Sequence, residues 1–296
     1  MDASSDIRQF LATRRAAISP AQAGLATYGR RRVPGLRREE VAMLAGVSTD
    51  YYARLERGNL TGVSDSVLDA VAGALRLDEA EHAHLRDLAR AANTASRPRR
   101  RRPPRQVSAG IQRILEGMTG IPAAVMNERL DLLATNQLGR ALYLPVYADP
   151  VRPVNLARFC FLDPQARAVY PNWDEAANTT VAMLRTEAGR NPFDRDLSDL
   201  IGELATRSDI FRNRWAAHNV RLHRTGAKTF MHPVVGELTL SFEVMALSST
   251  PGLTLTAYSA EPGTASADGL SLLASWAATA DQDQREQSMT RPPTER

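Results

Sequence analysis

Arginine side chains dominate one stretch of the chain, residues 28–58, which reads YGRRRVPGLRREEVAMLAGVSTDYYARLERG. Three arginines at 30–32 precede a Pro-Gly break, and Arg37 and Arg38 follow it. The guanidinium group is permanently charged and forms paired hydrogen bonds with phosphate oxygens or with the O6 and N7 atoms of guanine. The chemistry that this spacing offers is recognition of a polyanion, and double-stranded DNA is the polyanion that we expect.

The residues after these arginines have the layout of a helix-turn-helix. Arg37–Ala45 and Ser48–Arg57 are predicted helices, and Gly46 lies in the tight turn between them. A glycine suits this turn because the backbone conformation there is costly for other residues. Ala42 is the small residue at which the two helices cross. The positions predicted to face inward are Val41, Leu44, Val47, Tyr52 and Leu55.

The outward side of the second predicted helix supplies the candidates for reading base edges, because a helix-turn-helix places this side in the major groove. Arg54 is the first candidate, since arginine pairs well with guanine. Arg37 and Arg38 lie at the start of the first helix and are assigned to phosphates. Ser48, Thr49, Asp50, Ala53 and Arg54 are expected to point outward. The predicted DNA-binding residues are Arg30, Arg31, Arg32, Arg37, Arg38, Ser48, Thr49, Asp50, Tyr51, Arg54 and Arg57.

Two features of this stretch have structural alternatives. The arginines at 30–32 either follow the phosphates or enter a minor groove, where such contacts sense groove shape, or they form a solvated loop. Glu56 is expected to be a structural partner of an arginine, since a carboxylate is repelled by nearby phosphates.

The charge distribution divides the chain. Up to Arg105 there are 19 arginines against 12 acidic residues, a net charge of +7, whereas the remainder carries −3, which gives +4 in all. The seam is ASRPRRRRPPRQ at 95–106, either a solvated tether or a further contact with the DNA backbone. We therefore expect an N-terminal domain at 1–94, this linker, a second domain at 107–280, and a disordered tail at 281–296.

Hydrophobic periodicity predicts an α+β protein with different secondary structure in the two domains. The first domain is helical throughout, with five predicted helices. The second mixes helices with strands of alternating apolar residues, as in ELTLSFEVMAL at 237–247, which is typical of an antiparallel sheet. Besides the helix-turn-helix, the predicted helices are Ile7–Arg15, one capped by Ser64, Glu79–Ala92, Ser108–Met118, Trp173–Ala188 with Asn172 as N-cap, the apolar stripe Leu197–Leu204, Ser208–His218 and Ala267–Ala280. The predicted strands are Ala123–Asn127, Leu130–Thr135, 237–247 and Leu253–Ala257.

The sequence offers little for catalysis. It contains no G-x-S-x-G, H-E-x-x-H, Walker or G-x-G-x-x-G motif. Cys160 lies in the apolar segment RFCFLD and is interpreted as an inert buried thiol. His218, His223 and His232 fall on different predicted elements, so we expect neither a metal nor another cofactor. A single cysteine, no long apolar run and no signal peptide favour a cytoplasmic protein with no membrane partner.

The chain resembles the XRE/Cro-type helix-turn-helix regulators, and within them the MmyB-like group. The resemblance lies in the segment RRRVPGLRREEVAMLAGVSTDYYARLERG and in VLDAVAGALRLDEAEHAHLRDLA at 67–89. It continues in NLARFCFLDPQAR at 155–167, NWDEAANTTVAMLR at 172–185, FRNRWAAHNV at 211–220, FMHPVVGELTLSFEVM at 230–245 and TAYSAEPGTAS at 256–266. The resemblance implies a transcription regulator whose PAS-like second domain binds a small, lipid-like molecule, with fatty acids as the expected class.

A pocket in the second domain is expected to be mostly apolar, with few polar anchors. Arg185 or Arg214 is the candidate partner of an acidic head group, because arginine pairs with carboxylates through two hydrogen bonds. The alternatives are that the aromatic residues form ordinary core and that the arginines form surface ion pairs. The predicted ligand-binding residues are Trp173, Arg185, Phe211, Arg214, Trp215, His218, Phe230 and Phe242.

The expected function is a non-enzymatic, DNA-binding regulator that acts as a homodimer, because one such domain offers only a small basic surface and paired half-sites raise affinity. Two other classes are compatible with the sequence. One is a constitutive DNA binder whose second domain only dimerises or recruits a protein. The other is an enzyme with a DNA-binding appendage.

Overall fold

The computed structural model describes residues 3–26, 33, 35–93, 106–148, 153–217 and 225–290. The chain forms two compact units that alternate along the sequence. The first contains Met1–Arg102 together with Asn178–Leu222, and the second contains Pro103–Ala177 together with His223–Arg296. The segment 95–105, which holds nearly all of the expected linker, lies outside the described residues.

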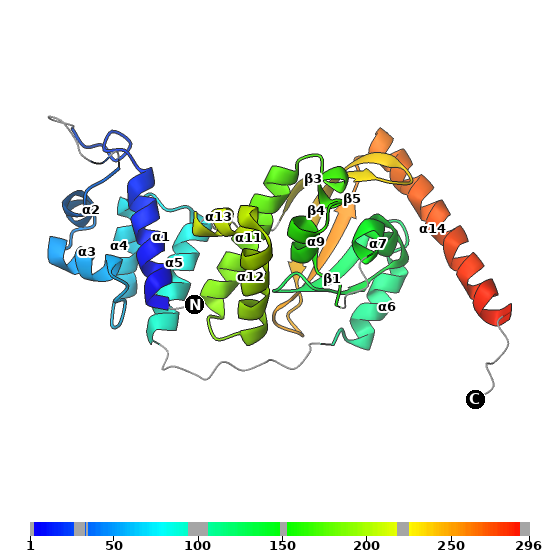
Figure 1. Ribbon diagram of the computed structural model, residues 1–296, viewed down its shortest axis with the longest axis horizontal. Coiled ribbons are helices and arrows are strands. Elements are labelled where there is room, and N and C mark those ends of the chain that lie inside the picture. Colours follow the sequence, from blue (N-terminus) through cyan, green and yellow to red (C-terminus); the bar gives the residue numbers. More distant parts are fainter. Residues whose placement is uncertain are drawn as a thin grey trace. The chain divides into compact units, whose positions relative to one another are not determined.

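Helices α1 to α5 follow the sequence prediction closely (Figure 1). Each is amphipathic and buries one stripe in a common core, which includes Phe10, Tyr52 and Leu85. The predicted cap of α4 is confirmed, because the side chain of Ser64 accepts a hydrogen bond from the amide of Val67. The bounds are Ala3–Ala17 for α1, Arg38–Leu44 for α2, Thr49–Glu56 for α3, Asp65–Ala74 for α4 and Glu79–Asn93 for α5.

Two glycines allow α1 to lie close to the helix-turn-helix. A Cβ atom added at Gly35 would lie 2.5 Å from the carbonyl oxygen of Ala16, and one at Gly58 would lie 2.3 Å from that of Ser4. Gly58 also has φ +97, a conformation that favours glycine. Backbone contact of this kind excludes any side chain at either position, so both glycines are needed to hold α1 in place.

Three further helices belong to the first unit: α11 (Trp173–Arg190), which begins in the second unit, α12 (Arg195–Arg207) and α13 (Asp209–Ala216). Asp194 caps α12 by accepting a hydrogen bond from the amide of Leu197, and Ser208 caps α13. The predicted apolar stripe on α12 is confirmed, since Leu197, Leu200, Ile201 and Leu204 are all buried.

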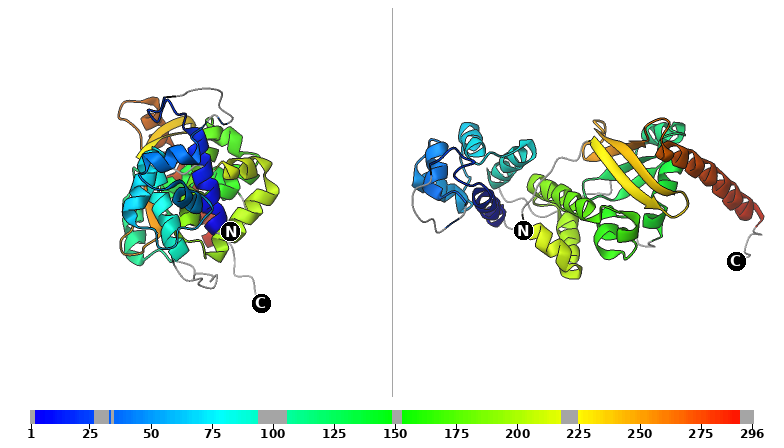
Figure 2. Two further views of the ribbon diagram at one scale, coloured as in Figure 1. Left: turned by 90° about the vertical axis from the view of Figure 1, so that its left-hand side faces the viewer. Right: turned by 90° about the horizontal axis from the view of Figure 1, so that it is seen from above.

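The second unit is built on one antiparallel sheet with the strand order β2-β1-β5-β4-β3. This is the PAS-like α+β arrangement that was expected. Strand β3 was not predicted, because its sequence shows no regular alternation of apolar and polar residues. A lysine, Lys228, lies on the core-facing side, where an apolar residue would be expected. The β3–β4 hairpin, yellow to gold in Figure 2, forms one edge of the sheet. The bounds are Ala123–Asn127 for β1, Leu132–Thr135 for β2, Thr225–His232 for β3, Gly236–Ala246 for β4 and Leu253–Ser259 for β5.

Helices pack on both faces of this sheet. Helix α6 (Ala109–Gly117) packs on one face, where Leu115 contacts residues of β1 and β5. The larger core lies on the other face, under α7, α9, α10 and the first half of α14. The bounds are Gln137–Leu142 for α7, Leu144–Tyr147 for α8, Leu156–Leu162 for α9, Ala166–Val169 for α10 and Ala265–Thr290 for α14.

Helix α14 runs well past Ala280, where the last helix was expected to end, and residues 291–296 lie outside the described residues. Helices α7 to α10 were not predicted, because elements of four to seven residues hardly show a helical period and these four, unlike α2, are not part of a helix-turn-helix.

Candidate nucleic-acid interface and ligand site

The turn between α2 and α3 has the geometry that the sequence predicts. Gly46 adopts φ +65, and the amide of Val47 donates a hydrogen bond of 2.9 Å to the carbonyl of Ala42. The hydroxyl of Ser48 accepts a hydrogen bond of 3.1 Å from the amide of Tyr51 and so caps α3. Leu44 is an exception to the inward set: it is 37% exposed, because α2 ends there and turns its last side chain toward solvent.

Glu56, on the buried side of α3, holds this helix against α1 and α2. Its side chain is only 3% exposed and accepts two hydrogen bonds of 2.9 Å from Arg15 on α1. Arg38 donates two further bonds, of 3.2 and 3.1 Å, to the same carboxylate. Burial alone would raise the pKa of Glu56, but the hydrogen bonds from the two arginines outweigh it and hold the pKa below its usual value. The prediction that Glu56 is a structural partner of an arginine is confirmed.

The opposite side of α3 is exposed. Ser48, Thr49, Asp50 and Arg54 are all exposed there, and the guanidinium of Arg54 lies 5.0 Å from the ring centroid of Tyr51. Stacking on this ring limits the number of positions that the long Arg54 side chain can adopt. Of the charged side chains on α3, only Glu56 faces the core, so the exposed face is left to the residues expected to read DNA.

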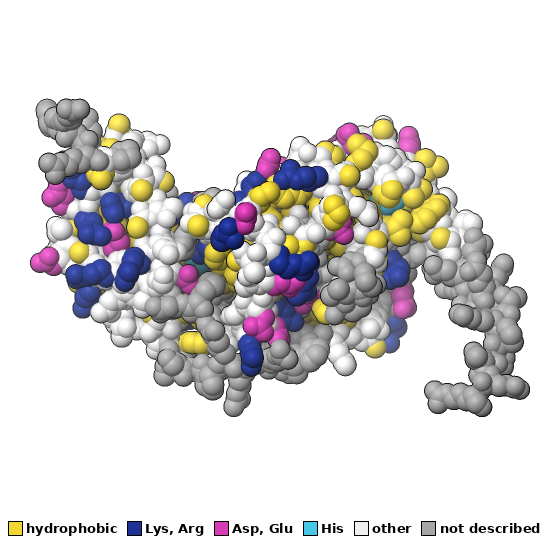
Figure 3. Space-filling model, viewed as in Figure 1, with side chains coloured by type: hydrophobic (Ala, Val, Ile, Leu, Met, Phe, Trp, Pro, Cys, Tyr) yellow, Lys and Arg dark blue, Asp and Glu magenta, His cyan; other side chains and the backbone are white. Residues whose placement is uncertain are grey.

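Further arginines surround this face. Arg37 is exposed and pairs with Glu39 at 3.2 Å, Arg38 keeps a side chain that is 54% exposed beside Glu56, and Arg57 is exposed after α3. Figure 3 shows basic side chains gathered on the N-terminal helices. Arg30, Arg31 and Arg32 lie outside the described residues.

The predicted ligand-binding residues fall into two groups. Trp173, Phe230 and Phe242 belong to the core between the sheet and its covering helices. Phe211 and Trp215 instead stack on each other along α13, with ring centroids 5.6 Å apart. His218 lies outside the described residues. The first group alone lies on the face of the sheet where a pocket was expected.

The two candidate arginine anchors contact helices of the first unit. Arg185 is 2% exposed, its guanidinium carbon lies 4.0 Å from the ring centroid of Trp215, and it donates a hydrogen bond to the carbonyl of Trp215. Burial lowers its pKa to about 10. Arg214 donates to the side-chain oxygen of Asn178. Both guanidinium groups therefore hold α11 and α13 together.

A basic residue that the sequence analysis did not single out lies in the sheet core. Lys228 on β3 places its ammonium nitrogen 4.1 Å from the ring centroid of Tyr170 and 5.1 Å from that of Phe230. Two tyrosines from other elements lie beside these rings, and the hydroxyls of Tyr143 and Tyr258 are 2.5 Å apart. The one signal in the sequence is that Lys228 is the only lysine of the chain.

The side chains of His232 and Trp173, beside this core, are hydrogen-bonded within the protein. His232 contacts the carbonyl of Ala141 at 3.0 Å, and burial lowers its pKa. Trp173 donates its indole N–H to the carbonyl of Cys160 at 2.9 Å. Cys160 itself is buried and forms no disulfide, as predicted.

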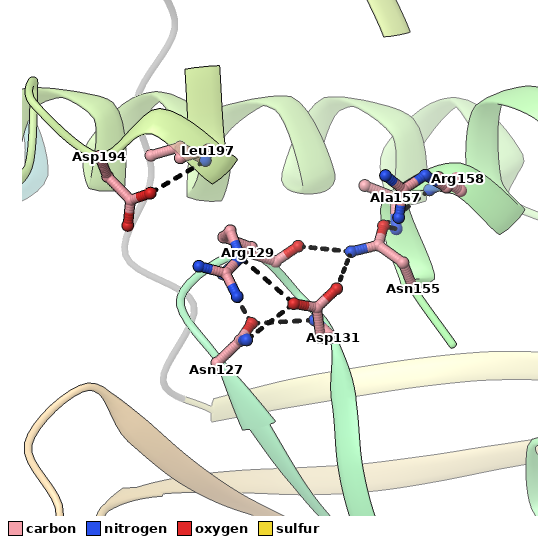
Figure 4. A network of polar contacts seen from close by, with 8 residues as sticks. All are labelled: Asn127, Arg129, Asp131, Asn155, Ala157, Arg158, Asp194 and Leu197. Carbon is pink, nitrogen blue, oxygen red and sulfur yellow. Dashed lines mark hydrogen bonds and ion pairs between the residues drawn. The ribbon is translucent and has the colours of Figure 1, made fainter. Parts of the chain in front are cut away.

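A buried polar network fixes the start of α9 against the sheet (Figure 4). Asp131 accepts hydrogen bonds of 2.8 Å from the amides of Asn127 and Asn155 and pairs with Arg129 at 3.2 Å. Asn155 in turn caps α9 by accepting bonds from the amides of Ala157 and Arg158. Because both carboxylate oxygens of Asp131 have hydrogen-bond partners in this network, we interpret the network as structural.

An open cleft of about 420 Å³ lies at the β2 edge of the sheet. It is bounded by α6, β2, α7 and α8 and includes Gln112, Thr135, Arg140 and Tyr147. None of the predicted ligand-binding residues lines it. In the described part of the chain, no group of three or more His, Cys, Asp or Glu side chains is arranged to hold a metal ion. Nor is any helix within those ranges long and apolar enough to cross a membrane.

The geometry of residues 3–93 and of the sheet defines a class of protein. Residues 8–85 match the family model of a helix-turn-helix domain, so the chain is a DNA-binding transcription regulator that also carries a ligand-binding domain. Residues 107–273 match the MmyB-like transcription regulator ligand binding domain. This match covers more than half of the chain, and the protein belongs to the MmyB-like family. A comparison with curated proteins found no match.

Proposed function

We propose that this protein is a cytoplasmic, sequence-specific, non-enzymatic regulator that binds operator DNA as a homodimer and is modulated by a small, fatty-acid-like ligand. The observation that carries the DNA-binding part is the exposed face of α3, held by the Glu56 ion pairs beneath it. A rigid helix with an exposed polar face matches what entry into a major groove requires.

The residues of this interface take different roles in the proposal. Arg54 reads a guanine, while Ser48, Thr49, Asp50 and Tyr51 complete the contacts of the first turns of α3. Arg37, Arg38 and Arg57 contact phosphates, and the arginines at 30–32 extend the contact along the backbone or into a minor groove. Arg38 has two roles in this proposal. It stabilises α3 by pairing with Glu56, and the exposed half of its side chain contacts a phosphate.

Homodimerisation would give this small interface enough affinity. Two half-sites about one helical turn apart allow two copies of α3 to read DNA at once. If each copy neutralises roughly four phosphates, the logarithm of the binding constant should fall against the logarithm of the salt concentration with a slope of about −7.

The ligand-binding part of the proposal is supported by the core on the larger face of the sheet, which is mostly apolar and mixes in a few buried polar groups. Helix α11 offers a route from this core to the DNA-binding helices. Its first turn contains Trp173, packed in the core, and its last residue, Arg190, pairs with Asp87 of α5 at 3.2 Å. A ligand that favours one position of α11 would change DNA affinity, and a hundredfold change corresponds to about 2.7 kcal/mol.

The experiment that tests the DNA-binding part is selection of an operator from random DNA by the full-length protein, followed by fluorescence anisotropy. We expect Arg54→Ala to lose preference for the selected site, whereas Arg113→Gln, which removes an exposed arginine from α6, keeps it. Equal binding of selected and random DNA by the wild-type protein would contradict the proposal.

The ligand-binding part has a separate test. Medium- and long-chain fatty acids should raise the thermal midpoint of the full chain and change its affinity for the selected operator. A protein that binds its operator but responds to no such compound would instead be a constitutive regulator whose second domain dimerises or recruits a partner.

A further inference from the structure

Lys228 lies on the core side of an edge strand. Along β3, the side chains of Thr225, Ala227 and Met231 are exposed, whereas Phe230 and His232 are buried. Because successive side chains of a strand point to opposite faces, Lys228 shares the face of Phe230 and His232. Its partner across the hairpin is Leu240, which is fully buried in the same core. The one lysine of the chain therefore points toward the apolar interior, and the residue keeps only part of its surface accessible.

Two aromatic rings contact this lysine, and further rings pack around one of them. Tyr143, Tyr170 and Tyr258 each place their ring within 6.2 Å of the centroid of Phe230, and Lys228 lies over the faces of Phe230 and Tyr170. These three tyrosines are themselves buried. Tyr143 and Tyr170 directly follow α7 and α10, and Tyr258 lies on β5, so several parts of the chain converge on one polar cluster inside an apolar core.

The charge of Lys228 has no carboxylate partner among the described residues. The titratable side chains on its face of β3 or beside its ring neighbours are Cys160, His232, Tyr143, Tyr147, Tyr170 and Tyr258, and none is a carboxylic acid. Burial raises the pKa of Tyr143 and Tyr170 well above the usual value and that of Tyr258 to about 12, so all three phenols are neutral. Burial lowers the pKa of Lys228 to about 8, because the rings replace only part of its hydration.

This cluster differs from the other buried polar sites of the protein. In the network around Asp131 every charged oxygen is hydrogen-bonded within the protein, and both Arg185 and Arg214 hold helices together. A buried cation without an anion is unfavourable unless something brings the missing charge. Ring faces stabilise such a cation but do not neutralise it.

We infer that Lys228 is the anchor for the acidic head group of the ligand, a carboxylate joined to an apolar chain, with the hydroxyls of the tyrosines packed around Phe230 (Tyr143, Tyr170 and Tyr258) as further hydrogen-bond donors. This inference rests on the ligand-binding function proposed above and moves the head-group contact from the two arginines to β3. The apolar residues of the same face, among them Phe242 and Leu240, would contact the chain of the ligand.

The test is to compare two ligands that differ only in the head group. Laurate and 1-dodecanol are titrated into full-length wild-type protein, Lys228→Met, Lys228→Arg and the control Arg113→Gln, with binding measured by isothermal titration calorimetry. We expect Lys228→Met to weaken laurate binding at least tenfold and to leave dodecanol binding unchanged. Lys228→Arg keeps the charge and should stay within about threefold of wild type, as should Arg113→Gln.

The outcomes separate this inference from the proposed function. If Lys228→Met binds laurate as tightly as wild type, or if wild type prefers dodecanol, the head-group assignment is wrong while ligand binding stands. If wild type binds neither compound and no fatty acid changes its thermal midpoint, the fatty-acid part of the proposed function falls with it. Thermal midpoints of the unliganded variants show that loss of binding is not loss of folding.

A pH series gives a second readout. Laurate binding needs the ammonium form of Lys228, so its affinity should fall as the pH rises through and above about 8, while dodecanol affinity stays constant. Because the three phenols beside Lys228 have raised pKa values, they do not titrate in this range. A laurate affinity that is flat between pH 7 and 10 would contradict a role for Lys228.

Discussion

Glu56 in the first unit and Lys228 in the second are both charged residues set into a core, but their surroundings differ. Glu56 receives four hydrogen bonds from Arg15 and Arg38, and these hold its pKa down despite burial. Lys228 lies over the ring faces of Tyr170 and Phe230, and burial lowers its pKa to about 8. The difference separates a charge that organises the fold from a charge that is available to a ligand. Removing the charge of Glu56 should lower the stability of the protein, whereas removing the charge of Lys228 should weaken ligand binding.

The largest effect is expected at Glu56. Glu56→Gln removes the charge that two arginines share, and breaking a buried ion pair costs about 3 kcal/mol of unfolding free energy. Chemical denaturation of the full chain, followed by circular dichroism, measures this loss. The matched control is Glu39→Gln, which breaks an exposed pair with Arg37 and should change stability little. If Glu56→Gln and wild type were equally stable, the claim that the charge of Glu56 organises the fold would be wrong.

The same ion pairs predict an acid sensitivity. Because the pKa of Glu56 is lower in the folded than in the unfolded protein, its contribution is present above the unfolded value of about 4.5 and is lost as the pH falls through the folded value. Stability measured between pH 3 and pH 7 should therefore fall toward acid in wild type more steeply than in Glu56→Gln. Parallel curves for the two proteins would show that Glu56 does not titrate as described.

A smaller effect, on DNA binding alone, is expected on the exposed side of the same helix. Arg54→Ala should weaken operator binding by about 1–3 kcal/mol through loss of the paired hydrogen bonds to guanine. Its thermal midpoint should stay close to that of wild type, because Arg54 is exposed and contacts only the ring of Tyr51. Operator anisotropy and thermal unfolding of one preparation measure both. If Arg54→Ala lowers the thermal midpoint but binds the operator normally, Arg54 stabilises the fold and does not contact DNA.

Removing the charge of Lys228 should have the opposite effect on stability to removing the charge of Glu56. Without ligand, Lys228→Met removes an uncompensated charge from an aromatic site and should leave stability unchanged or raise it by about 1 kcal/mol. Differential scanning calorimetry at pH 7 tests this, with Lys228→Arg as the variant that keeps the charge. A loss of stability as large as that of Glu56→Gln would mean that Lys228, too, organises the fold.

The smallest effect is expected where α11 contacts α5. Arg190→Gln breaks the partly exposed pair with Asp87 and should lower stability by no more than about 0.5 kcal/mol. Its effect should instead be on coupling, so that laurate changes operator affinity less than in wild type. Arg195→Gln, which breaks an exposed pair on α12, is the control. An unchanged ligand response in Arg190→Gln would remove this contact from the proposed route.

The sequence was most informative where local signals agree. The helices of residues 3–93 could be predicted to within a few residues, since long apolar stripes coincide with capping residues such as Ser48 and Ser64 and with the turn at Gly46. Strand β4 could be predicted from its alternation alone. The partnership of Glu56 with an arginine followed from its position beside residues expected to meet phosphates.

The rest depends on contacts between distant residues. Helices α7 to α10 are too short to show a clear period and lack the helix-turn-helix context that identified α2. Strand β3 carries a lysine where an apolar residue would complete its alternation. Nothing in the local sequence indicates that Arg185 packs against Trp215 or that Lys228 lies over Tyr170, because these partners are 30 or more residues away in the chain. The sequence therefore predicts an acidic-ligand anchor among the arginines, whereas the proposal of Lys228 depends on contacts that only the structure shows.

The most direct test of the central claim is operator affinity of the full-length wild-type protein with and without saturating laurate, measured by fluorescence anisotropy on the selected site and on random DNA. The account predicts preferential binding to the selected site and a change of at least tenfold in its affinity on adding laurate, with no such change for Lys228→Met. Operator binding that is indifferent to laurate, or no preference for any DNA sequence, would contradict it.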